Sequence, residues 1–74
     1  MTPGQCRAAR ALIGISRADL AHAALVTSGV VMDFENGTRV PQKAYLDAIR
    51  RALEAAGVMF VDRDGHGVGV RLRK

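Results

Sequence analysis

The 74-residue chain has a single cysteine, Cys6, which argues against a secreted fold held together by disulfides. A lone thiol is typical of a protein in the reducing cytoplasm. The chain also lacks the run of about 20 apolar residues that a membrane-spanning helix needs. Its first residues, which include Pro3, Gly4 and Arg7, do not resemble the apolar region of a signal peptide. We therefore expect a cytoplasmic protein that does not enter the membrane.

Residue sets that would support catalysis or metal binding are also missing. His22 and His66 are isolated, with no cysteine or pair of carboxylates at ligand spacing. Gly65, Gly67 and Gly69 precede a predicted strand rather than a helix, so they do not form a dinucleotide-binding loop. No serine or cysteine has a recognisable acid–base partner in the sequence. We expect no catalytic activity, no metal and no cofactor.

The sequence has no internal repeats and no linker long enough to separate two units. With 74 residues the chain is about half as long as a usual domain, so its core must be small and association with a second copy is a reasonable expectation. Eleven lysine and arginine residues stand against seven acidic ones, a net charge of +4. This charge balance favours a polyanion as partner.

Capping signals predict the first helix. Thr2 and Gln5 have the spacing of a capping box, and Pro3 suits the first helical position, so a helix should run from there to about Ile13. Gly14 can adopt the left-handed conformation that ends it. The residues expected on its inner face recur at helical spacing: Cys6, Ala9, Leu12 and Ile13.

Two short helices should follow, joined by a tight turn. Ser16 and Asp19 repeat the capping signal and predict a helix over about 17–24. Thr27 is the next possible cap, for a third helix that ends near Asn36 and Gly37. Only a few residues remain between the two helices, so the turn must be tight.

The longest helix and a β-hairpin complete the chain. Pro41 should open the helix, Leu46, Ile49 and Leu53 should face inward, and Gly57 should end it. Beyond Gly57 the apolar period changes to two, which predicts strands over 58–61 and about 68–72 around a turn rich in glycine and aspartate.

The segment from Arg10 to Pro41 resembles the DNA-binding domains of the Cro/phage-repressor (Xre) family, and the resemblance covers roughly residues 2–57. The matching positions are Leu12, Gly14, Ser16, Asp19, Leu20, Ala21, Val31, Phe34, Glu35, Asn36, Gly37 and Pro41. The resemblance implies a mainly α, four-helix lambda-repressor-like helix-turn-helix domain over 1–57, followed by a C-terminal β-hairpin and basic tail over 58–74. It also implies a structural ion pair between Arg10 and Glu35, and packing of Leu20 and Ala21 between the two helices of the motif.

The resemblance implies a DNA-facing side on the third helix. The residues expected to contact bases are Thr27, Ser28, Gly29, Met32 and Asp33, and those expected near phosphates are Arg17, Asn36, Arg39 and Lys43. Relatives often carry Arg, Gln or Asn, which contact guanine or adenine through two hydrogen bonds, where this chain has Ser28 and Gly29. Leu25 replaces a common turn glycine, so the turn either avoids positive φ or tolerates strain there.

These expectations describe a transcriptional regulator, a repressor rather than an activator, that binds duplex DNA as a homodimer at a palindromic operator. We expect the hairpin to mediate dimerisation through Val58, Phe60, Val68, Val70 and Leu72. Alternatively, those residues cover the subunit's own core. Two other functions stay open. One is a protein-interaction module, such as an antitoxin or anti-activator that binds a regulatory protein partner. The other is architectural DNA binding without sequence preference.

Overall fold

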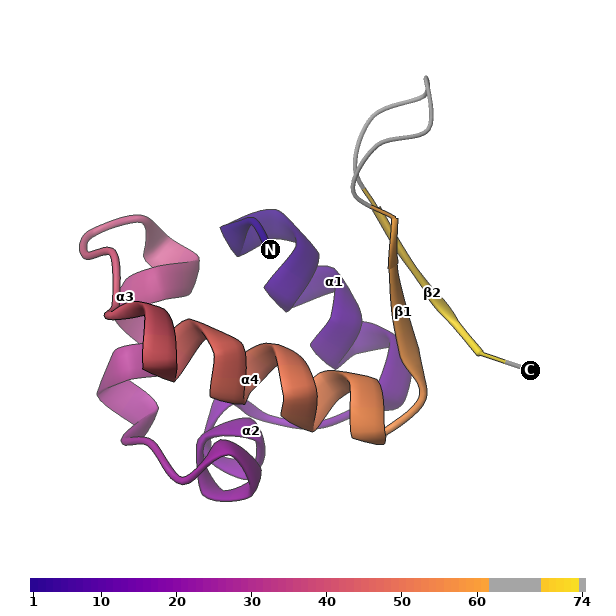
Figure 1. The fold of residues 1–74 in the computed structure, drawn as a ribbon, viewed down its shortest axis with the longest axis horizontal. Helices are drawn as coiled ribbons and strands as arrows, with labels where there is room; N and C mark the ends of the chain where they lie inside the picture. Colours follow the sequence, from indigo (N-terminus) through magenta and orange to yellow (C-terminus); the bar gives the residue numbers. More distant parts are fainter. Residues whose placement is uncertain (62–68, 74) are drawn as a thin grey trace.

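The computed structural model describes residues 1–61 and 69–73, which form four helices and an antiparallel pair of strands (Figure 1). The elements in chain order are α1 (Pro3–Ile13), α2 (Arg17–Ala24), α3 (Ser28–Asn36), α4 (Lys43–Ala55), β1 (Val58–Val61) and β2 (Gly69–Leu72). The fold is therefore mainly helical with a small C-terminal hairpin, as the sequence predicts.

The predicted caps set the limits of the first three helices. In α1 the Oγ1 atom of Thr2 accepts a hydrogen bond from the Gln5 amide at 3.0 Å, and Gln5 Oε1 accepts one from the Thr2 amide at 2.8 Å. Ser16 and Asp19 form the same reciprocal pair at the start of α2. Thr27 caps α3 by accepting a hydrogen bond from the Val30 amide at 3.3 Å. These bonds satisfy amide groups that a helix leaves unpaired at its N-terminus.

The start of α4 differs from the prediction. The helix begins at Lys43 rather than at Pro41, because Gln42 keeps an extended backbone conformation with ψ 152°. The Gln42 carbonyl then accepts the first helical hydrogen bonds, from the amides of Tyr45 and Leu46. Further along α4, Leu46 is half-buried while Ile49 and Leu53 are fully buried, so the inward face is confirmed.

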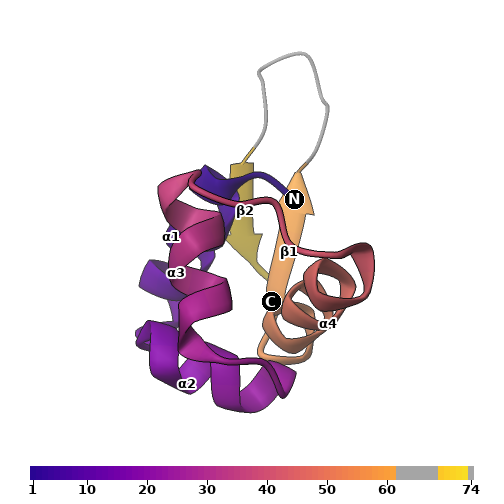
Figure 2. The ribbon, with the colours of Figure 1, turned by 90° about the vertical axis from the view of Figure 1, so that its left-hand side faces the viewer.

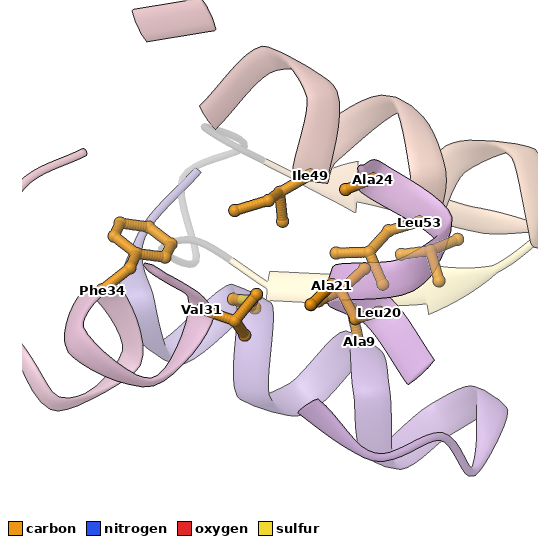
Figure 3. Close-up of a cluster of buried hydrophobic side chains, with 10 residues drawn as sticks. Ala9, Leu20, Ala21, Ala24, Val31, Phe34, Ile49 and Leu53 are labelled. Carbon is orange, nitrogen blue, oxygen red and sulfur yellow. The ribbon is translucent and has the colours of Figure 1, made fainter. Parts of the chain in front are cut away.

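The core lies between the four helices and β1. Its apolar members are Cys6, Ala9, Leu20, Ala21, Ala24, Val31, Phe34, Ile49, Leu53 and Val58, and Figure 3 shows side chains from α1, α2, α3 and α4 meeting there. The expectation for Leu12 is wrong, since this side chain is 42% exposed. Leu12 lies to one side of the helical stripe formed by Cys6, Ala9 and Ile13, outside the described residues that form or pack against the core.

The hairpin packs against its own chain. Val58 pairs with Leu72 and Phe60 with Val70, so these four side chains share one face of the two strands. Val58 is fully buried, and Phe60 and Val70 pack against the core formed with α1 and α4. The expectation of a dimer contact at Val58 is therefore corrected, because its own subunit covers it completely. Val68 lies outside the described residues.

Polar contacts hold the hairpin in place. The Nε2 atom of Gln5, which is buried on α1, donates to the carbonyl oxygens of Val61 at 3.3 Å and Gly69 at 3.0 Å. The guanidinium of Arg50 lies 4.6 Å from the ring centroid of Phe60, a cation–π distance. One residue from each of α1 and α4 thus fixes the strands where they leave the core.

Across residues 1–61 and 69–73, no helix combines the length and the apolar character that a bilayer crossing would require.

Leu25 is the non-glycine residue with positive φ in the described chain, at φ 60° and ψ 41° between α2 and α3. Its side chain is 90% exposed and contributes no packing that would offset the strain. Of the two expectations for this turn, tolerated strain is the correct one. Two hydrogen bonds hold the backbone in this conformation, since the Leu25 amide and the Val26 amide both donate to carbonyls at the end of α2.

We predict that Leu25→Gly raises the free energy of unfolding by about 0.5–1 kcal/mol, because glycine adopts this conformation without a Cβ penalty. Leu25→Ala is the matched control: it removes the same exposed side chain but keeps the Cβ atom, and its stability should stay close to that of the unmodified chain. Urea unfolding followed by circular dichroism measures both. A glycine variant no more stable than the alanine variant would contradict the strain argument.

Candidate nucleic-acid interface

A buried carboxylate joins the first three helices. Glu35 on α3 is 1% exposed, and Arg10 of α1 binds it through two hydrogen bonds, Nε to Oε2 and Nη2 to Oε1, both at 2.7 Å. This is the ion pair that the family resemblance implies. Arg17 of α2 also donates from Nε to Glu35 Oε1 at 3.0 Å. From the sequence, Arg17 is expected near a phosphate; in the structure its partner is Glu35.

Other groups complete what we call the Glu35 cluster: Glu35 with Cys6, Arg7, Arg10 and Arg17. The Cys6 Sγ atom donates to Glu35 Oε2 at 3.1 Å, and Arg7 Nη1 donates to the backbone carbonyl of Glu35. Burial, together with the bond to Glu35, raises the pKa of the Cys6 thiol to about 12. Cys6 is therefore a protonated hydrogen-bond donor at neutral pH, unsuited to act as a nucleophile.

The Glu35 carboxyl is ionised at neutral pH. Burial by itself would raise its pKa, but the hydrogen bonds from Arg10, Cys6 and Arg17 outweigh burial and hold the pKa below its ordinary value. A carboxylate whose pKa is lower in the folded state stabilises the fold above its unfolded pKa, and this contribution is lost as the pH falls through the folded pKa. The cluster is therefore a source of stability at neutral pH.

Part of the predicted DNA-facing side is a surface hollow of about 560 Å³ between the start of α2 and α3. It is lined by Arg10, Ser16, Arg17, Ala18, Ser28, Gly29 and Met32. In Figure 2, α3 faces the viewer with α2 beneath it and α4 to its right. The structure thus brings the predicted base-contacting residues Ser28, Gly29 and Met32 to one place, beside Arg17.

Asp33 does not join that group. It lines a second hollow, of about 260 Å³, together with Val30, Arg39, Val40, Pro41, Gln42 and Tyr45. The hydroxyl of Thr38 donates to Asp33 Oδ1 at 3.4 Å, and the Thr38 amide donates to the Asp33 carbonyl at 3.0 Å. Asp33 therefore fixes the turn after α3. Asp33 stands four residues after Gly29, so the two share the exposed face of α3 although they line different hollows.

The other predicted phosphate contacts are exposed. Asn36, Arg39 and Lys43 all lie on the surface, and the Lys43 side chain is 88% exposed. Lys43 Nζ pairs with Asp47 Oδ2 at 2.9 Å, an exposed i,i+4 ion pair that restrains the lysine only weakly. Thr27 is exposed as well, with its hydroxyl oxygen engaged in capping α3.

Two members of the Glu35 cluster, Cys6 and Arg7, were not predicted from the sequence to contact Glu35. Cys6 stands one helical turn before Arg10, and Arg7 stands three residues before it, so both could have been placed on the Arg10 side of the first helix. The buried role of Gln5 gave no such signal, because its contacts to the hairpin depend on how distant segments pack. Within 1–61 and 69–73 no three His, Cys, Asp or Glu side chains gather as metal ligands would.

No protein-family model matches this chain, and no curated protein is significantly similar to it in sequence.

We predict that Glu35→Gln lowers the free energy of unfolding at pH 7 by about 3 kcal/mol, because it leaves the arginine charges without their carboxylate. The difference from the unmodified chain should shrink as the pH falls below about 4.3, the ordinary glutamate pKa, because Glu35 of the unfolded chain then takes up a proton, and it should be lost once the pH has passed through the lower pKa of the folded state. Urea unfolding at pH 7, 5, 4 and 3 measures the difference.

Asp47→Asn is the matched control, since Asp47 also accepts a hydrogen bond from a cation but lies exposed. Its substitution should change stability little at any of these pH values. A Glu35→Gln difference that grew as the pH fell would contradict the assigned direction of the pKa change.

Proposed function

We propose that the chain is a sequence-specific DNA-binding transcriptional regulator, a repressor, in which α2 and α3 act as a helix-turn-helix. The observation that carries the proposal is the uncovered face of α3 beside the start of α2, where Ser28, Gly29 and Met32 adjoin Arg17. In a helix-turn-helix the first helix crosses the DNA backbone and the second places its N-terminal residues on base edges. The resemblance to the Cro/phage-repressor (Xre) family supports the same assignment of these helices.

The charges around this face suit a duplex. The chain carries a net charge of +4, and Arg39 and Lys43 are exposed near the C-terminal end of α3 and the start of α4. Cations at these places can neutralise phosphates on either side of a helix that lies in the major groove. Asn36, exposed in the last turn of α3, can donate to a phosphate oxygen.

Base contacts would come from short or apolar side chains. Ser28 can bond to several bases, and the Met32 side chain, 42% exposed, can contact a thymine methyl group. Neither forms the pair of hydrogen bonds by which Arg or Gln selects a base, so DNA shape must supply part of the specificity.

A homodimer belongs to this proposal, with two copies on the half-sites of a palindrome. The shared apolar face of Val58, Phe60, Val70 and Leu72 is turned to the subunit's own helices, and Leu72 keeps 42% of its surface exposed. A second copy would therefore contact Leu72 and an unpaired strand edge rather than that whole face. The hairpin and α3 lie at opposite ends of the subunit in Figure 1, so such a contact leaves α3 free.

Two exposed apolar side chains favour a second candidate function, a protein-interaction module of the antitoxin or anti-activator kind. Leu25 is 90% exposed and Val40 is 84% exposed. A partner that covered them would bind through apolar contacts, which respond little to salt, whereas DNA binding weakens steeply with salt.

Selection of bound molecules from a random duplex pool, at low and moderate salt, tests the function directly. We expect enrichment of a palindromic site and weaker binding at the higher salt. Salt-sensitive binding without enrichment would indicate architectural binding. Absence of binding at both salt concentrations would overturn the DNA proposal in favour of the protein-interaction module.

Substitutions at the expected phosphate contacts and at the expected base contacts should have different effects. Arg39→Ala and Lys43→Ala should weaken binding to every duplex and each lower the slope of log K against log salt by about 0.9. Ser28→Ala and Met32→Ala should instead change the preferred sequence. Arg51→Ala is the control, because it removes one exposed positive charge from α4 away from both hollows. Equal slopes for the Arg39, Lys43 and Arg51 variants would reject the phosphate assignment.

A further inference from the structure

The hairpin has a second face, which points away from the helices. Side chains alternate along a strand, so the neighbours of the inward-facing Phe60 and Val70 point outward. Arg73 continues this side of β2, since its amide donates to the Gly57 carbonyl at 2.6 Å and extends the ladder by one pair. We call this surface the outer hairpin face, and its residues are Met59, Val61, Gly69, Arg71 and Arg73. A Cβ atom added at Gly69 would meet no other atom within 4 Å, so the face is open.

The outer hairpin face carries two positive charges without a counter-charge. Arg71 and Arg73 are both exposed, and among the residues that the structure describes neither takes part in an ion pair or a side-chain hydrogen bond. No member of the face is acidic. The two residues stand about 6.8 Å apart along the strand. Their charges repel one another, and an anion that contacted both would relieve this repulsion.

The outer hairpin face is remote from α3. Helix α1 packs against both α3 and the strands, and so lies between them. Figure 1 shows α3 and the hairpin at opposite ends of the subunit, and Figure 2, turned by 90°, shows the strands behind α3. A straight duplex bound to α3 therefore does not reach Arg71 and Arg73 of the same subunit.

The other exposed arginines do not extend this face. Arg7 contacts the Glu35 carbonyl of α3, Arg39 lines the hollow beyond α3, and Arg51 belongs to α4. The chain thus presents cations near α3 and a separate arginine pair on the hairpin.

We infer that the outer hairpin face binds the phosphate backbone of a second duplex segment, so that the protein joins two stretches of DNA. The inference rests on the proposed DNA-binding function and goes beyond it. Guanidinium groups bind phosphates through paired hydrogen bonds. A β-strand rises about 3.4 Å per residue, which equals the axial spacing of phosphates on one DNA strand, so a strand along the duplex axis brings Arg71 and Arg73 to every second phosphate. An acidic protein segment has no such fixed spacing of charges.

Capture of a second duplex tests this inference. The full chain is bound to an immobilised duplex that carries the selected site, or to a random-sequence duplex if no site is enriched. A fluorescent duplex without the site is then added at low salt. We expect the unmodified chain to retain it, and the Arg71→Ala, Arg73→Ala double variant to retain about tenfold less per bound protein. The affinity of this variant for the immobilised duplex should stay within about twofold of the unmodified chain.

Single substitutions give the matched control. Arg71→Ala and Arg51→Ala each remove one exposed positive charge, but only Arg71 belongs to the outer hairpin face. Retention of the fluorescent duplex should fall about threefold for Arg71→Ala and stay within about twofold for Arg51→Ala. Circular dichroism and light scattering check that each variant is folded and has the mass of the unmodified protein.

Arginine modification gives a readout that needs no variant. Phenylglyoxal reacts with accessible guanidinium groups, and mass spectrometry measures the reaction at each arginine. The first duplex alone, at one molecule per binding site, should leave Arg71 and Arg73 reactive, and the second duplex should protect both. Arg71 and Arg73 that stay reactive with the second duplex present would contradict the inference.

The outcomes separate this inference from the proposed function. If the chain binds the first duplex but retains no second one, or if the double variant retains it equally well, the second site is overturned and DNA binding stands. If poly-glutamate is retained where the second duplex is not, the face binds acidic protein and the duplex assignment is overturned. If the unmodified chain binds no duplex at all, both the inference and the proposed function are overturned.

Discussion

The ionised carboxylate of Glu35 is the constraint on which the helical part of this fold depends. A charge with 1% exposure is tolerated in a small core only because Arg10, Arg17 and Cys6 donate to its two oxygens. These donors come from α1 and α2, so neutralising one buried charge also fixes two helices against α3. In a chain of 74 residues, such a contact adds specificity that apolar packing of mostly small side chains would supply less well.

The orientation of α3 follows from this constraint. Glu35, Val31 and Phe34 anchor one side of the helix in the core, and Ser28 and Met32 lie at the exposed border of that side. The same anchoring leaves Arg17 at the boundary between the core and the surface. The proposed DNA-binding face therefore borders the core, and Arg17 contacts the buried Glu35 while it also lines this face.

The hairpin shows that an apolar segment can be recognised from the sequence while the surface it packs against stays open. The alternation over 58–61 and 69–72 predicts strands, and strands form there. Whether their apolar face meets a second copy or the same chain depends on where α1 and α4 end in space. Gln5, which donates to both strands, is more than 50 residues away from them in sequence, so no local pattern predicts its contacts.

Local chemistry in the sequence determined the limits of α1, α2 and α3 and the strand positions, because capping boxes, left-handed glycines and apolar periods act within a few residues, whereas the start of α4 at Lys43 was not predicted. The Arg10–Glu35 pair followed from resemblance to a known family. Only the tertiary structure decided that Arg17 and Cys6 join Glu35, that Leu12 stays exposed and that Asp33 and Ser28 line different hollows. Those outcomes depend on how the helices pack around a buried charge, and packing between distant segments is not encoded in any short stretch of sequence.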